Sequence, residues 1–376
     1  MSKTPFESAT IGGIKVKNRI FRSATHESTA LPGGGVSKAM TDMYQDLTQG
    51  EVGLIITGYM SFSKEDNPTA STVLIGDDAA VPGLKALTET VHQGGGRIVT
   101  QLAHVGSQLT HPPTGAIFAP SDVVDPVNGI KPEPFSREQI QTLVKEFGDA
   151  AVRAKAAGFD GVQIHGAHGY LVSKFLSPEF NLREDEYGGT PEKNVRVAVD
   201  ILKEIKARCG ADYPVWIKMN CSDFGRENRG FAFEGALVAA KALDDAGIDA
   251  IELSGGTFAG EHTPCRSRKH GAYHLEYAKQ LTREIDTPVI LVGGIREIEV
   301  IEKILGDTDI EAISLSRPLI REPGLVGRWK DGDRSKAACV ACNGCFNPTG
   351  CVCFFTLEGE ARAAQKHRLE QFFWKK

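Results

Sequence analysis

Residues 136–167 read SREQIQTLVKEFGDAAVRAKAAGFDGVQIHGA and contain both repeating elements of the predicted fold. Ser136 and Gln139 have the spacing of a capping box, apolar residues follow at helical intervals, and Gly158 ends the run. Residues 136–158 therefore predict an amphipathic helix. The apolar run 161–167 predicts a strand that is covered on both faces, and a helix followed by such a strand is typical of a parallel α/β sheet.

The same alternation extends along the chain in both directions. Helices are also predicted between Thr190 and Gly210 and over 233–247, each ending at a glycine. Apolar runs predict strands at 18–24, 52–58, 96–102, 161–167, 214–220, 250–256, 288–294 and 312–318. Eight strand–helix repeats over roughly 300 residues fit a closed (β/α)₈ TIM barrel better than an open doubly wound sheet.

Segments outside the repeats complete the predicted organisation. Residues 9–19 alternate apolar and polar residues around Gly12 and Gly13, which predicts an N-terminal β-hairpin at the bottom of the barrel. Residues 107–135 are rich in Pro and Gly and predict a long loop after the third strand, over the active-site end. We expect one barrel domain over 1–335 and a Cys-rich C-terminal extension, 336–376, packed on the barrel.

Composition narrows the classes of function. The 376 residues carry a formal net charge of −5 with no long basic run, so nucleic-acid binding is not expected. No apolar run approaches the length of a membrane span, and residues 1–13 have no secretion-signal pattern. These features predict a cytoplasmic protein that acts on a small molecule.

Polar residues and glycines stand at the end of every predicted strand. In TIM barrels the active site lies at these carboxyl ends, so the pattern predicts a site there. The residues, in strand order, are Ser23, Ala24 and Thr25; Gly58; Gln101 and His104; His165 and His168; Lys218 and Asn220; Ser254 and Gly255; Gly293 and Gly294; Ser316 and Arg317.

The ends of the last two strands predict a phosphate site. Gly293 and Gly294 let backbone N–H groups approach an anion, and Arg317 can contact it through two N–H groups. A tight turn with a surface arginine is the simpler alternative. Lys218 lies within an apolar strand and requires an anionic partner, which is either a reduced isoalloxazine ring or a carboxylate in a structural ion pair.

Residues 165–170, HGAHGY, place two imidazoles and a phenol after the fourth strand. Neighbouring histidines can bind zinc, but no third ligand follows at ligand spacing. The alternative is that His165 and His168 polarise a substrate carbonyl and that Tyr170 supplies a proton.

The stretch from His165 to Gly189, HGAHGYLVSKFLSPEFNLREDEYGG, closely resembles the signature of the Old Yellow Enzyme and enoate reductase group of NADH:flavin oxidoreductases. NRIFRSAT (18–25), QLAHVG (101–106), VGGI (292–295) and SRPLIREP (316–323) resemble further landmarks of that group in the same order. The resemblance covers roughly residues 5 to 345 and implies an FMN-binding TIM barrel.

The resemblance also implies a role for each matching residue. The flavin ring would be held by Ser23, Ala24, Thr25, Gly58, Gln101 and Lys218, and its phosphate by Gly293, Gly294, Ser316 and Arg317. His165 and His168 would bind the substrate carbonyl, and Tyr170 would donate the proton. NADH or NADPH would reduce FMN, which then passes hydride to an activated alkene. A homo-oligomer is expected from the habit of the family.

Two departures from the family pattern stand out. His26 occupies the position of a cysteine or threonine that tunes the flavin in relatives. Cysteines 339, 342, 345, 351 and 353 resemble the iron–sulfur site of larger relatives, but the spacing differs. Three alternatives remain open: reduced thiols, an iron–sulfur or zinc site with Cys339, Cys342 and Cys345 as first candidates, and local disulfides.

Two other functions remain open alongside the flavin enzyme. One is a phosphate-binding TIM-barrel lyase or isomerase, for which Lys218 would be the Schiff-base lysine. The other is a non-catalytic flavin redox sensor that uses the clustered thiols as its output.

Overall fold

A closed parallel barrel forms the centre of the computed structural model, which describes residues 3–63, 66, 68–266, 271–345 and 350–372. The strand order is β10-β11-β12-β3-β4-β5-β8-β9. The strands are β3 (Ile20–Arg22), β4 (Leu54–Met60), β5 (Ile98–Leu102), β8 (Gly161–Gly166), β9 (Val215–Asn220), β10 (Ala250–Ser254), β11 (Val289–Val292) and β12 (Ala312–Leu315). The predicted (β/α)₈ barrel is confirmed, since each predicted strand range overlaps one of these strands.

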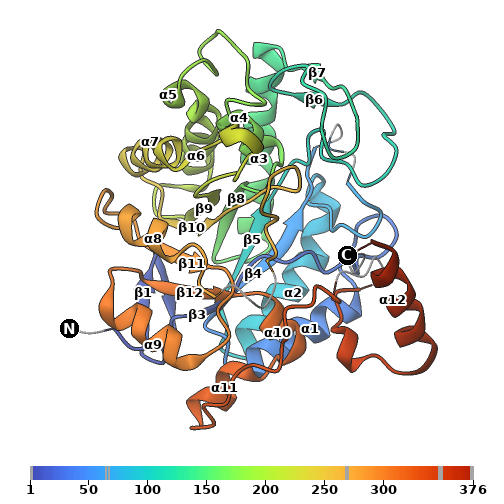
Figure 1. Cartoon of the computed structure of the whole chain (residues 1–376), viewed down its shortest axis with the longest axis vertical. Helices are drawn as coiled ribbons and strands as arrows, with labels where there is room; N and C mark the ends of the chain where they lie inside the picture. Colours follow the sequence, from blue (N-terminus) through green and yellow to red (C-terminus); the bar gives the residue numbers. More distant parts are fainter. Residues whose placement is uncertain (1–2, 64–65, 67, 267–270, 346–349, 373–376) are drawn as a thin grey trace.

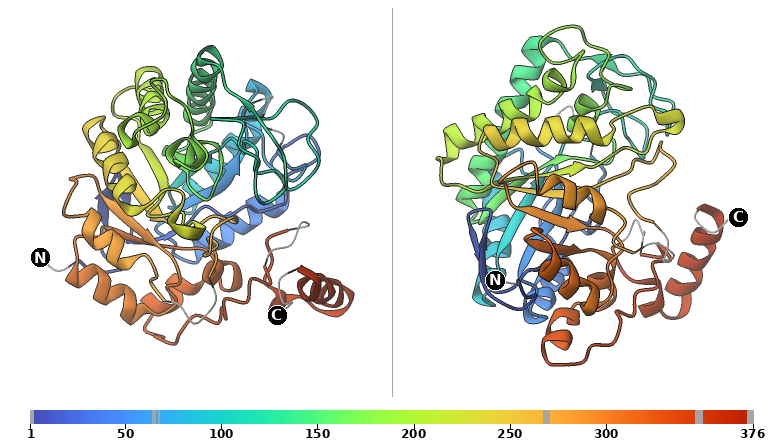
Figure 2. Two further views of the ribbon diagram at one scale, coloured as in Figure 1. Left: turned by 45° about the horizontal axis from the view of Figure 1, so that its top comes forward. Right: turned by 60° about the vertical axis from the view of Figure 1, so that its left-hand side comes forward.

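Helices surround the barrel, as Figures 1 and 2 show. The predicted helix over 136–158 is α3, which begins with the capping box of Ser136 and Gln139 and buries Ile140, Leu143 and Phe147. The helices are α1 (Lys38–Gln49), α2 (Val81–Gln93), α3 (Arg137–Ala156), α4 (Leu171–Leu176), α5 (Pro191–Asn194), α6 (Arg196–Cys209), α7 (Phe233–Asp245), α8 (Leu275–Leu281), α9 (Ile298–Asp307), α10 (Arg317–Arg321) and α11 (Leu325–Lys330). Short 3₁₀ turns lie at Asp78–Ala80, Arg226–Asn228 and Phe354–Thr356.

The predicted N-terminal hairpin is confirmed. Strands β1 (Ala9–Ile11) and β2 (Ile14–Val16) pair in antiparallel register. Ile11 and Ile14 are buried in one apolar cluster with Trp216, whose indole nitrogen donates to the carbonyl of Gly12 at 2.9 Å. The hairpin therefore fills the amino-terminal end of the barrel, so that the opposite end is left for a site.

Three local details differ from the sequence prediction. The helix expected after Thr190 is divided into α5 and α6 at Val195. The long loop contains the two-residue strands β6 (Phe118–Ala119) and β7 (Glu133–Pro134), which pair with each other. Strand β4 continues past Gly58 to Met60, with a register shift between Ile56 and Tyr59. Gly58 is therefore inside the strand, and Tyr59 lies near its end.

The C-terminal residues leave the barrel after α11 and end in α12 (Gly359–Phe372), which lies beside the barrel in Figure 1. The N–H of Ala337 donates to the carbonyl of Arg296 at 2.9 Å, and the N–H of Cys351 donates to that of Glu27 at 2.8 Å. These bonds connect the extension to loops at the mouth of the barrel. The division at residue 335 stays a prediction. Among the helices of the described residues, none is long and apolar enough to cross a membrane.

Candidate active site at the mouth of the barrel

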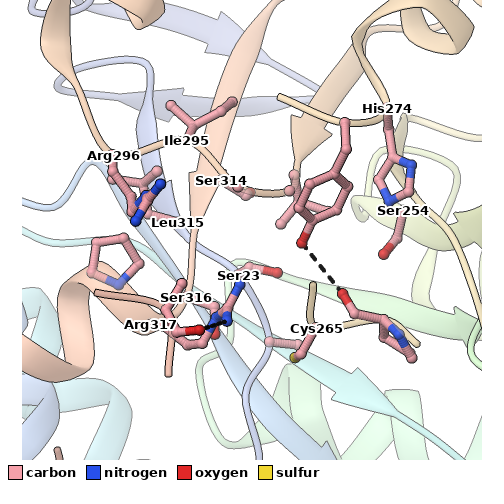
Figure 3. Close-up of a pocket in the computed structure, with 18 of the residues that line it drawn as sticks. Ser23, Ser254, Cys265, His274, Ile295, Arg296, Ser314, Leu315, Ser316 and Arg317 are labelled. Atoms are coloured by element: carbon pink, nitrogen blue, oxygen red, sulfur yellow. Dashed lines mark hydrogen bonds between the residues drawn. The ribbon is translucent and has the colours of Figure 1, made fainter. Parts of the chain in front are cut away.

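A pocket opens at the carboxyl ends of β3, β9, β10, β11 and β12. Figure 3 shows Ser254 and His274 on one side of it and Arg296, Ser316 and Arg317 on the other. Nine of the strand-end residues predicted from sequence line this pocket: Ser23, Ala24, His168, Lys218, Ser254, Gly293, Gly294, Ser316 and Arg317. The structure thus brings together residues that are up to 294 positions apart in the sequence, from Ser23 to Arg317. Thr25, Gly58, Gln101, His165 and Tyr170 lie outside its lining and are placed below.

One end of the pocket has the features of an anion site. Gly293 and Gly294 have φ values of +132° and +75°, in the region that favours glycine. A Cβ on Gly293 would lie 2.6 Å from Cε2 of Tyr273, so a larger residue does not fit. Arg317 lies at the same end, where one of its guanidinium nitrogens donates to Oδ1 of Asn343 at 2.6 Å. Backbone N–H groups and a guanidinium within one pocket suit a phosphate.

A connected layer of polar side chains crosses the barrel beneath the pocket. Lys218 Nζ donates to Ser23 Oγ at 2.7 Å and lies 3.6 Å from Oε2 of Glu252. Ser23 Oγ donates to Oε1 of Glu252 at 2.7 Å. The Gln163 amide donates to Glu252 at 2.9 Å, and Gln101 Nε2 donates to Gln163 Oε1 at 2.7 Å. All five side chains are buried, so this layer fixes their orientations below the ligand.

Glu252 and Gln163 were not among the predicted site residues. Both lie in the middle of apolar strands, where sequence reasoning considered only the strand ends. From the sequence, Lys218 had two possible anionic partners, a flavin ring or a carboxylate. The structure shows the carboxylate, Glu252, and it also places Lys218 in the pocket lining. A signal was available, because a carboxylate inside an apolar run requires a buried cation, and Glu252 is the register partner of Lys218.

The two predicted histidines lie side by side after β8. Their ring centroids are 5.4 Å apart. His168 has a φ of 66°, which is uncommon for a residue with a side chain, and its Nε2 lies 2.8 Å from Oγ of Ser254. Among the described residues, none bonds Nδ1 of the buried His165. A strained backbone and an unsatisfied ring nitrogen are typical of a ligand-binding site.

Burial keeps both imidazoles neutral. It lowers the pKa of His165 to about 3, with a further decrease from the charge of Lys218. Burial also lowers the pKa of His168 well below its usual value, assisted by His165 and Lys218. Each neutral ring has one N–H donor, so the pair can donate hydrogen bonds to one oxygen without carrying charge.

Tyr170 also lies beside His165, with 4.8 Å between the two ring centroids. Burial raises the pKa of its phenol above the usual value, against a smaller decrease caused by Gln108. The hydroxyl is therefore protonated at neutral pH and can act as a proton donor. Tyr170 also contacts Tyr59, at a centroid distance of 6.0 Å.

Three predicted flavin residues lie outside the pocket lining, and two of them, Thr25 and Gln101, connect to it through neighbours. Thr25 Oγ1 lies 2.8 Å from Oγ of Ser316. Gln101 connects through Gln163, as described above. The N–H of Gly58 donates to a carboxylate oxygen of Glu27 at 2.8 Å. Glu27 is buried and also accepts from Tyr44, so it fixes the loop after β3 against β4.

Two of the cysteines lie at the Arg317 end of the pocket. Cys265 and Cys339 are part of its lining, and burial raises the pKa of both thiols. Burial also raises the pKa of Cys351 to about 12. All eight cysteines lie in the described part of the chain, and no disulfide joins any of them. Within these residues, no three His, Cys, Asp or Glu side chains form a group that could hold a metal ion.

The residues present fit FMN. The Gly293 cradle and Arg317 suit its phosphate, and the polar layer with Lys218 suits its ring. Two further groups of the lining, Nε2 of His274 and Oγ of Ser314, are buried without a partner among the residues that the structure describes. A bound ligand rich in hydroxyl and carbonyl groups would satisfy them.

Known proteins are similar to this chain in sequence. The chain is 33% identical to an NADH oxidase of Thermoanaerobacter brockii over 91% of its length, and it spans 53% of that protein. It is 32% identical to an NADPH dehydrogenase of Bacillus subtilis (strain 168), with 86% of this chain and 93% of the relative covered. The chain thus spans about half the length of some relatives and nearly all of others.

Solved structures with a similar fold include reductases. An Old Yellow Enzyme homologue from Zymomonas mobilis has a TM-score of 0.75 at 26% identity, over 89% of this chain and 94% of that one. A 2-naphthoyl-CoA reductase has the same fold, with a TM-score of 0.83 at 23% identity over 90% of this chain and 54% of that one. The model of the NADH:flavin oxidoreductase / NADH oxidase family matches residues 5–336. The chain therefore belongs to the NADH:flavin oxidoreductase / NADH oxidase family.

Proposed function

We propose that this protein is an FMN-dependent oxidoreductase that uses NADH or NADPH to reduce an activated alkene, such as an α,β-unsaturated carbonyl compound. Bound FMN would accept hydride from the nicotinamide and deliver it to the β carbon of the alkene. The observation that supports this proposal most is the position of the His165–His168 pair and Tyr170 next to a pocket with a phosphate-binding end.

The chain's own residues would bind and position the reactants. Neutral His165 and His168 donate hydrogen bonds to the substrate oxygen and stabilise the negative charge that develops there. Tyr170 gives its proton to the α carbon. Lys218, which bonds to Ser23 and pairs with Glu252, would help to hold the flavin ring and would supply a positive charge to it.

The two other candidate functions have less support. The family membership disfavours the lyase or isomerase, and Lys218 lies against Ser23 and Glu252 instead of standing alone. A flavin redox sensor would bind FMN and transfer electrons to no small molecule. No step of the proposed function uses the clustered thiols, because the described residues provide no group of metal ligands.

The first test is a visible spectrum, followed by anaerobic turnover with NADH or NADPH and a set of enones, enoates and enoyl thioesters. A yellow protein that oxidises NAD(P)H in step with alkene loss supports the proposal. A protein that stays colourless after reconstitution with FMN contradicts it. A yellow protein without turnover on any alkene or quinone indicates the sensor.

The metal content of the extension needs its own measurement. Anaerobically purified protein with stoichiometric iron or zinc would assign ligands to Cys339, Cys342 and Cys345. Protein without either metal would leave reduced thiols and local disulfides as the remaining alternatives, which thiol titration under denaturing conditions separates.

A homo-oligomer in the cytoplasm remains part of the proposal. It rests on the habit of the family and on the composition. Light scattering on the purified holoprotein and fractionation of the source cells test these two points.

A further inference from the structure

A row of hydrogen-bonding side chains extends from the proposed proton donor toward the surface. Tyr59, at the end of β4, packs against Tyr170 with 6.0 Å between ring centroids. The hydroxyl of Tyr59 lies 3.1 Å from Oγ1 of Thr72, which lies 3.3 Å from Nε2 of His26. Nδ1 of His26 lies 3.2 Å from Oγ of Ser28. The proposed function uses none of these four side chains.

Burial changes along this row from the inside to the outside. Tyr59 and Thr72 are buried, with 9% and 1% of their surface exposed, whereas His26 and Ser28 are partly exposed. Tyr59 also belongs to an apolar cluster with Ala103 and Val105, against which Tyr170 packs. The row is therefore a polar path through an otherwise apolar wall.

Two features place Tyr59 at the inner end of this path. The register shift in β4 between Ile56 and Tyr59 changes which residues face the mouth of the barrel. The His26 ring stacks on Tyr59 at a centroid distance of 5.1 Å and an interplanar angle of 28°. Burial raises the pKa of Tyr59, and the nearby phenol of Tyr170 raises it further.

We propose that Tyr59, Thr72 and His26 form a proton relay that returns a proton to Tyr170 after each turnover. The inference rests on the proposed function, in which Tyr170 gives its proton to the substrate carbon and becomes a phenolate. A buried phenolate must be reprotonated before the next alkene can be reduced, and the relay supplies that proton without opening the site.

Each member of the relay gives one proton and takes one. The hydroxyl of Tyr59 protonates the Tyr170 oxygen over one bridging water and recovers a proton from Thr72. Thr72 takes the Nε2 proton of His26, which takes one from solvent at Nδ1 on the Ser28 side. All groups return to their starting charge, and no electrons move. His26 is left with its proton on Nδ1 and recovers the Nε2–H tautomer by proton exchange with solvent before the next turnover. Burial lowers the pKa of His26, which favours the neutral ring that such a transfer requires.

The relay predicts a difference between the first turnover and later ones. In Tyr59→Phe, the first reoxidation of prereduced enzyme by cyclohexenone should stay within about twofold of wild type, because Tyr170 still holds its proton. The steady-state kcat with excess NADPH should fall about tenfold or more, within the usual contribution of general acid–base catalysis. Its solvent deuterium isotope effect should increase. Single-turnover and steady-state stopped-flow measurements under anaerobic conditions give both rates.

Matched variants separate the relay from a structural role. Thr72→Val and His26→Phe should show the same split between the two rates. Tyr213→Phe should change neither, since its hydroxyl bonds to the carbonyl of Phe159 away from the mouth of the barrel. If Tyr59→Phe does not retain FMN, Thr72→Val and His26→Phe decide by the same measurement.

An unchanged steady-state kcat in Tyr59→Phe, or an equal decrease in both rates, overturns the relay. Equal decreases would mean that Tyr59 only positions the substrate or Tyr170. A wild-type holoprotein that is not reoxidised by cyclohexenone or by any other alkene contradicts the proposed function itself, and the relay with it.

Discussion

Lys218 and Glu252 are register partners on β9 and β10, and Nζ of the lysine lies 3.6 Å from Oε2 of the glutamate inside the barrel. Glu252 has no exposed surface and also accepts bonds from Ser23 and Gln163. A lysine this deeply buried requires a carboxylate, because an isolated buried charge is costly. The charge that would face the flavin is thus held by a partner on the neighbouring strand.

Replacing Glu252 by Gln should destabilise the protein by about 3 kcal/mol, since it leaves the Lys218 charge buried without its partner. Urea unfolding of the holoprotein measures the change. Glu284→Gln, which removes an exposed partner of Lys241, serves as the control and should have no measurable effect. If Lys218→Met/Glu252→Gln is no more stable than Glu252→Gln alone, the loss does not come from the unpaired charge.

Tyr170→Phe should slow the transfer to the alkene by about 100-fold or more, because the variant has no proton to give. Reduction of the flavin by NADH should stay near the wild-type rate, since that step does not use the phenol. Stopped-flow measurement of each half-reaction gives both values. Similar losses in the two half-reactions would show that the role of Tyr170 is misassigned.

His165→Ala should weaken the binding of phenols, which imitate the enolate, by about tenfold or more. One hydrogen bond to a charged oxygen contributes about 1.5–3 kcal/mol. Titration of the flavin spectrum with a substituted phenol measures the affinity. His92→Ala is the matched control, because His92 pairs with Asp160 on the outside of the barrel. An unchanged phenol affinity in His165→Ala argues against the carbonyl-binding role.

His274→Gln should flatten the dependence of stability on pH. Burial lowers the pKa of His274 to about 3, so between pH 6.5 and 4.5 the unfolded chain gains a proton there that the folded chain does not. The wild-type protein therefore loses stability as pH falls through this range, by up to about 1.4 kcal/mol per pH unit from this one group. Urea unfolding at several pH values measures both slopes. Equal slopes in the variant and wild type would contradict the buried neutral state.

The barrel and the outline of the site could be predicted from the sequence because both follow local patterns. Strands buried on two faces give continuous apolar runs, and their polar ends converge wherever such a barrel closes. Gly293 and Arg317 were placed at one pocket by this logic alone, although they come from different repeats. The predicted end of the second strand, Gly58, was two residues too early, because β4 continues to Met60. The register shift that accompanies this difference leaves no pattern in the sequence.

The missed residues depend on tertiary contacts. Glu252 and Gln163 matter because they meet Lys218 and Gln101 across the barrel, and neither lies at a strand end. Tyr59 is placed beside Tyr170 by the bulge in β4, and His26 stacks on it from another loop. Of these contacts, only the pairing of Lys218 with Glu252 could have been predicted from the sequence, because the two residues are opposite charges within consecutive apolar strands.

The hydrogen bond between Arg317 and Asn343 matters when the chain is shortened for expression. The Arg317 guanidinium donates to Asn343 Oδ1 at 2.6 Å, beyond residue 336, where the family match stops. Trimming the gene to the matched region would delete that acceptor and the two extension residues, Cys339 and Ala341, that line the pocket. We expect a barrel shortened in this way to hold its cofactor less tightly, so that a colourless preparation could be mistaken for a protein without the function.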